Sequence, residues 1–389
     1  WSRRFIIMSE FKAAGFSDEF GGGPDIVGLT TFTSPYYFIP PSGSTAERPQ
    51  SAPPGMLRFN TDIGRLEVWR NDHWATILGE SPNLGDQNNT NSSGGTGTRA
   101  LIMGGQNPDG DLGSVEYLTI STLGNSQTFG NLSVTRSQGA GCASRVRGYM
   151  VGGFDNPSTL KNEIDSHEFA STGDFVDYGD LQSETRLNGS CSNSTRGLSL
   201  GGIAPAATDR IDYFHLATTG AEADFGNLSA TDSFGSALAS PVRGVYSDGS
   251  SNTNTLEYIT ISSTGNALNF GDLSQLRGTM VNSAANSTRG IFAGGDTNPG
   301  TPAVTNTIDF ITIATTGNAS DFGDLTRTTA ECNGAAASPT RAIFAGQGPS
   351  AADTIDYIEI LSTGNAVDFG NLGTLRSHAA GCSNGHGGL

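Results

Sequence analysis

Two kinds of charged residue recur at fixed places in this chain and are the first candidates for chemistry. An arginine opens a short apolar run six times, and an acidic residue opens the second apolar run of each copy. The arginines are Arg99, Arg147, Arg196, Arg243, Arg289 and Arg341, and the acids are Glu116, Asp165, Asp212, Glu257, Asp309 and Asp356. Six equivalent carboxylates could form a ring that binds a ligand. Because each acid has one arginine available to it, we favour six structural Arg–carboxylate pairs joined by charge-assisted hydrogen bonds.

The other reactive side chains form no catalytic pattern. The five histidines stand in unrelated contexts, which argues against a metal triad or a copper centre; they are His73, His167, His215, His378 and His386. Carboxylate pairs can always be found among 38 acidic residues, so they decide nothing about glycoside hydrolysis. Asp109-Gly-Asp111 lacks the other ligands of a calcium loop and is more typical of a turn. We therefore expect no catalytic residue, no metal site, no cofactor and no enzymatic activity, and the sequence leaves any ligand-binding residues unknown.

Three of the four cysteines are copies of one repeat position. Cys142, Cys191 and Cys382 each stand thirteen residues after the repeat aromatic, whereas Cys332 falls in the same segment but out of step. Equivalent positions in different repeats are expected to lie beyond the roughly 7 Å limit for a disulfide. We predict buried free thiols, which suit assembly in a reducing cytoplasm.

The repeat itself predicts the architecture. Successive copies of the arginine are separated by 48, 49, 47, 46 and 52 residues, a period typical of radially repeated antiparallel sheets. In the fifth copy, residues 289–293, 308–313 and 320–325 predict three strands, separated by Gly-Gly and Thr-Gly turns. The segment after Arg327 is rich in small residues, so we expect it to form a fourth, innermost strand beside a central axis.

The order of these segments predicts how the ring closes. The repeats begin at Arg99 with a Gly-Gly strand, and they end with an inner-type segment, 377–383, that no Gly-Gly strand follows. Pairing the two would remove both sheet edges. The sequence therefore predicts an all-β fold in which residues 98–389 form a six-bladed β-propeller closed by the C-terminal strand.

The repeat resembles that of the kelch family of β-propellers, in which paired glycines follow one strand, an aromatic marks the outer strand and an arginine precedes the inner one. The paired glycines are Gly104-Gly105, Gly152-Gly153, Gly201-Gly202 and Gly294-Gly295. The family's tryptophan is replaced by Phe129, Tyr178, Phe225, Phe270, Phe322 and Phe369. This departure favours a divergent, kelch-like lineage.

The first hundred residues are organised differently. Residues 1–54 are rich in Gly, Pro, Ser and Thr, which predicts an extended arm. Residues 55–80 predict a small β-meander with strands at 57–60, 65–69 and 74–77, and 81–97 predict a flexible linker. Because so short a meander cannot bury a core alone, we expect it to pack on a partner.

The meander carries a second resemblance. Gly55-Met-Leu-Arg-Phe-Asn-Thr-Asp, followed by Gly-Arg-Leu-Glu-Val-Trp69, resembles a small β-meander of tail-fibre and other virion proteins of tailed bacteriophages. The phrase Thr-Gly-Asn-Ala-x-Asp-Phe-Gly, together with Ser-Pro-Thr-Arg341, is similar to repeats in structural proteins of phages that infect cyanobacteria. These resemblances imply a kelch-like tail or fibre protein of the virion, present in several copies or as a homo-oligomer. It would be held by other virion subunits through residues 9–78 and would display its propeller to a host-surface glycan or protein, or serve as a scaffold.

Composition narrows the alternatives. A net charge of −17, with Lys12 and Lys161 as the only lysines, disfavours direct contact with nucleic acid. No apolar stretch approaches the roughly 18 residues of a membrane span, so we expect no membrane insertion. The remaining alternatives are a carbohydrate-binding propeller lectin and, behind it, a propeller glycosidase or oxidase.

Overall fold

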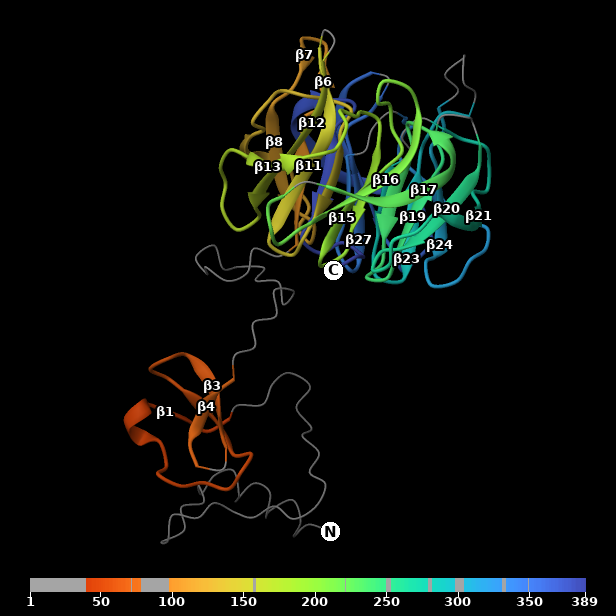
Figure 1. Ribbon diagram of the computed structural model, residues 1–389. Helices are drawn as coiled ribbons and strands as arrows, with labels where there is room; N and C mark the ends of the chain where they lie inside the picture. The colour runs from red at the N-terminus through yellow and green to blue at the C-terminus, as the bar shows by residue number, and fades with distance from the viewer. Residues whose placement is uncertain are drawn as a thin grey trace, which may run out of the picture. The chain divides into compact units, whose positions relative to one another are not determined.

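The computed structural model describes residues 40–70, 72–77, 98–156, 159–220, 222–249, 253–278, 282–297, 304–330, 334–348 and 350–389. The chain divides into two compact units, residues 1–80 and 81–389, and each is described by itself (Figure 1). Arm residues 1–39, the predicted linker 81–97 and Cys332 lie outside the described residues. No helix in the described part of the chain is long and apolar enough to cross a membrane.

The second unit contains six four-stranded antiparallel sheets, which are the blades of a β-propeller (Figure 1). From the innermost to the outermost strand, the first three blades are β30 (Ala380–Ser383), β5 (Arg99–Met103), β8 (Ser114–Thr119) and β9 (Gln127–Asn131); β10 (Ala140–Ala143), β11 (Arg147–Asp155), β12 (Thr159–Glu168) and β13 (Val176–Asp180); and β14 (Gly189–Ser192), β15 (Arg196–Leu200), β16 (Thr208–His215) and β17 (Ala223–Asp232). The last three are β18 (Ser236–Ala239), β19 (Arg243–Ser247), β20 (Thr255–Thr260) and β21 (Leu268–Asp272); β22 (Asn282–Ala285), β23 (Arg289–Ala293), β24 (Thr307–Thr312) and β25 (Ser320–Asp324); and β26 (Ala335–Ala337), β27 (Arg341–Ala345), β28 (Ala352–Glu359) and β29 (Val367–Arg376).

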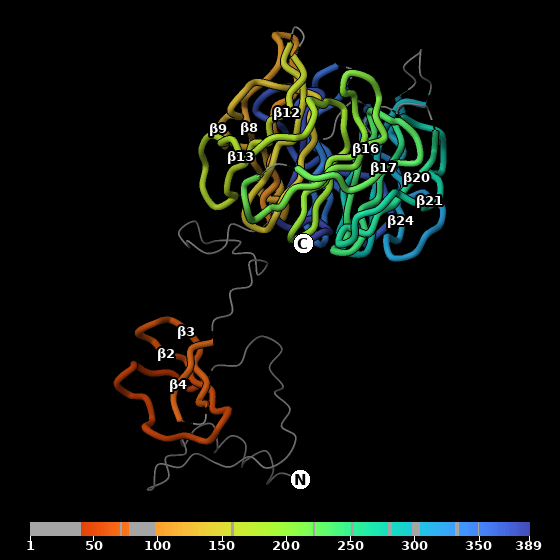
Figure 2. Tube along the Cα trace, viewed as in Figure 1, coloured from red at the N-terminus to blue at the C-terminus, as the bar shows by residue number. Residues whose placement is uncertain are grey.

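The C-terminal strand closes the ring, as the sequence predicts. β30 pairs antiparallel with β5, and the register places Ala380 opposite Met103 and Ser383 opposite Ala100. The first blade therefore takes its inner strand from the other end of the propeller, and Figure 2 follows the chain around the ring from orange to blue. This pairing leaves no inner strand missing in any of the six blades.

Glycines act where the backbone turns or where blades touch. Gly294 and Gly295 end the second strand of their blade with φ angles of +75° and +110°, which L side chains rarely adopt. Gly271 contacts the Thr-Gly turn of the next blade so closely that a Cβ there would lie 2.3 Å from the carbonyl oxygen of Gly317. The Gly-Gly turn and the glycine that follows the outer-strand aromatic therefore each have a steric cause.

The hydrophobic core lies between blades. The described buried residues form six clusters, and each cluster combines residues from two neighbouring blades. In one of them, Ile291 and Phe322 of the fifth blade pack with Phe344 of the sixth, and all three side chains are nearly or completely buried. Each blade thus depends on both neighbours for its buried apolar surface.

The first blade carries one additional hairpin in the loop between β5 and β8. It consists of β6 (Gln106–Asn107) and β7 (Gly110–Asp111). The Asn107 Oδ1 atom accepts hydrogen bonds from the backbone N–H groups of Asp109 and Gly110. Asp109-Gly-Asp111 is therefore part of a tight turn, as predicted.

The N-terminal unit is a four-stranded sheet. β2 (Leu57–Asn60), β3 (Arg65–Trp69) and β4 (Trp74–Thr76) match the predicted meander strands almost residue for residue. The structure adds a short strand, β1 (Ser42–Gly43), which pairs parallel with β2, and a 3-10 turn, η1 (Thr45–Glu47). Part of the segment that the sequence assigned to the extended arm therefore belongs to this sheet.

Candidate functional site

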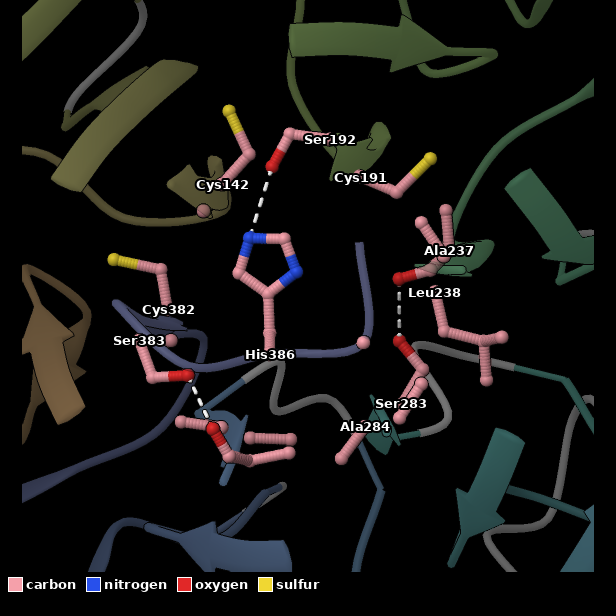
Figure 3. Close-up of a pocket in the computed structure, with 18 of the residues that line it drawn as sticks. Cys142, Cys191, Ser192, Ala237, Leu238, Ser283, Ala284, Cys382, Ser383 and His386 are labelled. Carbon is pink, nitrogen blue, oxygen red and sulfur yellow. Dashed lines mark hydrogen bonds between the residues drawn. The ribbon is translucent and has the colours of Figure 1, made fainter. Parts of the chain in front are cut away.

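The central axis is the first place to look for a binding site, since propeller channels are lined by equivalent residues of every blade. Here the lining consists of small side chains of the inner strands β10, β14, β18, β22, β26 and β30, and the cavity has a volume of about 60 Å³ (Figure 3). Inner strands are tied to one another by serine hydroxyls: Ser192 donates to Ala143 O at 2.7 Å, and Ser283 donates to Ala237 O at 2.8 Å. A space of this size holds a few waters and is small beside the pockets of about 300–1,000 Å³ that bind small-molecule ligands.

The C-terminal residues occupy the axis themselves. The His386 imidazole lies in the centre of the ring (Figure 3), where its Nε2 atom is 2.9 Å from Ala143 O and 3.2 Å from Ser192 Oγ. Gly387 N donates to Ala285 O at 2.8 Å on the opposite side of the ring. Burial lowers the pKa of His386 to about 4, so the ring is neutral near pH 7 and donates from Nε2. His386 therefore fills the axis with hydrogen bonds to two blades.

Cysteines of the axis are free thiols, as the sequence predicts. Cys142, Cys191 and Cys382 are all buried. Burial raises the pKa of Cys142 to about 12 and raises those of the other two. Because the thiolate is the nucleophile, these residues are unsuited to nucleophilic chemistry.

The six arginines that open the repeats do not contact the predicted acids. Five of them stack on an aromatic ring of their own blade, with guanidinium-to-centroid distances between 4.4 Å (Arg289 on Phe310) and 4.9 Å (Arg341 on Tyr357). Arg289 also donates to Ile360 O of the next blade at 2.8 Å. Arg147 pairs instead with Glu168 at 3.2 Å. The five stacked arginines join neighbouring blades, since each donates to a carbonyl oxygen of the next blade.

The acids pair with a second set of arginines, which corrects the predicted pairs. Four salt bridges are formed across blade boundaries: Arg376–Glu116 at 2.6 Å, Arg136–Asp165 at 3.1 Å, Arg277–Asp309 at 2.5 Å and Arg327–Asp356 at 3.1 Å. The strand register explains why the predicted Arg289–Asp309 pair does not form. Asp309 lies opposite Phe292, which is three residues along the strand from Arg289. That offset is about 10 Å at roughly 3.3 Å per residue. The acids are thus buried structural partners and form no open ring of ligand-binding carboxylates.

Two blades depart from this pattern. Arg136, Arg277 and Arg376 each stand seven residues after the aromatic of the outer strand, and the same count reaches Thr185, Asp232 and Thr329 in the other three cases. In the last of these, Arg327 lies two residues earlier and supplies the guanidinium instead. Asp232 accepts from Tyr246 Oη at 2.7 Å and Gly249 N at 3.0 Å. The spacing from the aromatic residue could have identified the buried arginines from the sequence. It was obscured in the second repeat, where Arg186 directly follows Thr185.

The two serines that stand in a Gly-x-Ser-x-Gly pattern are not placed as nucleophiles. Ser199 and Ser383 both stand in the pattern Gly-x-Ser-x-Gly, which sequence analysis passed over. A nucleophile elbow needs a sharp turn from strand to helix, whereas Ser199 lies within β15 and Ser383 ends β30. Their hydroxyls are engaged by Asn188 Nδ2 and Ala337 O. Within the described ranges, no group of three or more His, Cys, Asp or Glu side chains is placed to hold a metal ion.

The N-terminal sheet has an unusual distribution of side chains on its two faces. One face carries polar residues and is buried: Glu67 is fully buried, and it accepts from Arg48 Nε at 3.1 Å and from Asn60 Nδ2 at 3.1 Å. A second Arg48–Glu67 contact and the nearby Arg58 complete this cluster. The hydrogen bond from Arg48 is the main cause that lowers the pKa of Glu67. The segment 44–48 thus covers the polar face and satisfies it.

The opposite face is apolar, and among the described residues its side chains remain partly exposed. Alternation along the strands and the pairings Leu57–Val68, Phe59–Leu66 and Val68–Ala75 place these side chains together on one face. Leu57, Leu66 and Ile77 remain 44%, 39% and 42% exposed. Soluble surfaces seldom leave a contiguous sheet face of this kind uncovered. This face, formed by Leu57, Phe59, Leu66, Val68, Ala75 and Ile77 and called the apolar sheet face below, is the candidate functional site.

Comparison with protein-family models and with curated protein sequences finds no match to this chain. The residues themselves therefore carry the functional argument. The repeated charges and the axial histidine bond within the ring, and the described thiols are buried in it. The apolar sheet face, by contrast, has exposed side chains that a partner could bury.

Proposed function

We propose that this chain is a structural protein of a tailed-phage virion, in which the N-terminal sheet attaches to another virion subunit and the propeller is displayed. The resemblance of residues 55–69 to virion meanders supports the assignment. The observation that carries it is the apolar sheet face, because a sheet that buries its polar side and opens its apolar side is suited to contact with a partner.

The energetics favour docking through this face. Leu57, Leu66 and Ile77 are each about two-fifths exposed, and burying such side chains stabilises a complex by about 25 cal/mol per Å² of apolar surface removed from water. The polar face needs no further partner, because its carboxylate and guanidinium groups already bond to one another. A partner subunit would therefore add a second, apolar layer to the sheet.

The propeller is suited to display. It closes through β30 and β5 and buries its apolar residues between its own blades, so the ring does not need a partner to complete its core. Segments after the Gly-Gly turns differ between blades, as in 106–109 and 203–206, which fits contact with one host-surface glycan or protein better than repeated identical sites. The proposal places the protein in the virion, in several copies, assembled in the host cytoplasm, and assigns it no enzymatic step.

Incorporation into particles tests the proposal. In the full chain, Leu57→Ser with Leu66→Ser should abolish co-purification with virions, whereas the matched pair Val146→Ser with Val242→Ser, which replaces exposed apolar residues of the propeller, should leave it unchanged. Circular dichroism checks the propeller in both proteins, and tryptophan fluorescence checks the N-terminal sheet, which contains Trp69 and Trp74. Normal incorporation of the Leu57/Leu66 variant, or absence of the parent chain from virions, would refute the attachment role.

A further inference from the structure

The third blade differs from the others at both of its boundaries with neighbouring blades. At the other four boundaries of the ring, an arginine pairs with the repeated acid. Thr185 stands at the arginine's position between the second and third blades, and Asp232 stands there between the third and fourth. The backbone confirms both placements, since the Gly-Gly turn donates to the carbonyl oxygen at this position in each case, as it does to Arg136 O. Arg186 follows Thr185 directly but lies over the Phe154 ring of the second blade.

A second carboxyl group lies at the boundary between the second and third blades. At the other five boundaries, the backbone N–H after the Phe/Tyr-Gly-[Asn/Asp]-Leu phrase donates to the repeated acid. Here Gln182 N donates to Glu222 Oε2 at 2.8 Å instead. Asp212, the repeated acid, bonds to Arg210, whose Nη2 atom lies 2.7 Å from Asp212 Oδ2. Glu222 stands where three other blades have alanine (Ala267, Ala319 and Ala366).

The two acids line a small buried cavity, with a volume of about 20 Å³. Within the described residues, Thr185 Oγ1, Asp212 Oδ1 and Glu222 Oε1 have no hydrogen-bond partner. Two carboxyl groups face one guanidinium, that of Arg210, so a proton on Glu222 balances the charge and supplies a donor. Burial, followed by the neighbouring Asp212 charge, raises the pKa of Glu222 to about 8. The charge of Asp224 on β17 also acts on Asp212.

A pair of carboxyl groups lies at the boundary between the third and fourth blades. Asp232 accepts from Tyr246 Oη at 2.7 Å and is hydrogen-bonded to Asp248. Two carboxyl groups share a hydrogen bond only when one of them holds a proton, because an ionised carboxylate only accepts. Burial, followed by the hydrogen bond with Asp232, raises the pKa of Asp248 to about 7. Glu257, the repeated acid, faces the same tyrosine from β20.

We propose that the third blade is a pH-sensitive segment of the ring, which one proton holds at each boundary and which opens locally when those protons are lost. Loss of a proton leaves two buried negative charges side by side, and this favours states in which water reaches them. An arginine keeps its charge at these pH values, so the fifth blade, which has an arginine pair at both boundaries, lacks this dependence. Opening uncovers the apolar clusters on both sides of the third blade, which include Phe214 and Phe225.

Each proton stabilises the closed blade over a defined pH range. For Glu222, the contribution is complete below pH 4.5, the ordinary pKa, and is lost as pH rises through about 8. For Asp248, it is complete below pH 3.8 and is lost as pH rises through about 7. Each proton should therefore make opening of the third blade about fiftyfold more favourable between pH 5 and pH 7.

Hydrogen–deuterium exchange of the full chain at pH 5, 7 and 9, corrected for the pH dependence of chemical exchange, tests the proposal. At pH 9, we expect β15 and β16 of the third blade to be at least about tenfold less protected than β23 and β24 of the fifth. Glu222→Gln with Asp248→Asn puts an amide donor in place of each proton, so protection of the third blade should no longer fall as pH increases. Asp321→Asn with Asp368→Asn removes two exposed acids. This matched control has the same net charge and should behave like the parent.

Two results would overturn the pH-sensitive segment, and the first needs no variant. Equal protection of the third and fifth blades in the parent chain at pH 9 would show that the ring opens only as a whole. An unchanged pH dependence in the folded double variant would assign the effect to other groups. Should the double variant not fold, the single variants Glu222→Gln and Asp248→Asn replace it. Each should remove about fiftyfold of the effect between pH 5 and pH 7, and the absence of that loss in both overturns the proposal.

Discussion

The buried pair of Arg277 and Asp309 gives the sharpest test of how the ring is held together. Both side chains are fully buried, and the Arg277 guanidinium also donates to Gly294 O at 3.0 Å and to Thr307 O at 2.7 Å. Arg277→Met therefore leaves a buried carboxylate with only the Ser274 N–H and hydroxyl as donors, and two carbonyls without this donor. Breaking a buried pair costs about 3–5 kcal/mol, and each unsatisfied carbonyl adds about 1 kcal/mol.

The double variant should cost much less than the sum of its parts. Asp309→Leu alone leaves an uncompensated buried guanidinium and should also cost about 3–5 kcal/mol, whereas replacing both partners removes both buried charges. We expect a coupling free energy of at least about 3 kcal/mol between positions 277 and 309, the upper end of the range for residues in one hydrogen-bonded network. The matched control is Arg289→Met with Asp309→Leu, whose effects should add within about 0.5 kcal/mol because Arg289 contacts Phe310 and Ile360 instead.

Denaturant unfolding measures these free energies, and circular dichroism must be the probe. All three tryptophans lie in the first 74 residues, so tryptophan fluorescence does not report on the propeller. Coupling below about 0.5 kcal/mol for the 277/309 pair, or clear coupling between positions 289 and 309, would refute the assignment of the buried arginines as the partners of the repeated acids.

Three further predictions concern closure, pH and thiols. Deleting residues 377–389 removes β30 and exposes the edge of β5, so cooperative melting should be lost, whereas deleting only 386–389 should preserve it; equal melting of the parent and the longer deletion would contradict closure. In the fourth blade, burial and the hydrogen bond with Asp232 raise the pKa of Asp248 from 3.8 to about 7, so the stabilising contribution of its proton is complete below pH 3.8 and is lost as pH rises through 7. The melting temperature should therefore fall over that pH range by more in the parent than in Asp248→Asn. Equal slopes would refute a proton shared by Asp248 and Asp232. Cys142, Cys191 and Cys382 should resist thiol reagents in the native protein at pH 8 and react after unfolding, as mapped by mass spectrometry; rapid native labelling of these three would contradict their burial.

Local patterns in the sequence were sufficient for the strands and their order. Alternation and turn residues predicted 289–293, 308–313 and 320–325, and the structure has β23, β24 and β25 there within one residue at each end. The unpaired segment 377–383 predicted the closing strand because a missing inner strand can be counted without coordinates. The same alternation located all three meander strands. Strand patterns are local, so they can be found from the sequence alone.

Partners across blades could not be found in this way. The sequence shows that Arg289 and Asp309 recur together, but antiparallel register separates them along the strand, and the acid receives Arg277 from the preceding blade. The bond between Arg48, which follows η1, and Glu67 is likewise decided by contact between segments far apart along the chain.

The sequence by itself determined the six blades, their strands and the closure, because hydrophobic period, turn residues and repeat count are properties of neighbouring positions. Only the tertiary structure decided which charges meet, that His386 fills the axis, that the third blade contains a cavity with two carboxylates, and that the N-terminal sheet opens its apolar face. These features depend on strand register and on which side of a sheet is covered. A shift of one residue, as between Thr185 and Arg186, changes which side chains meet.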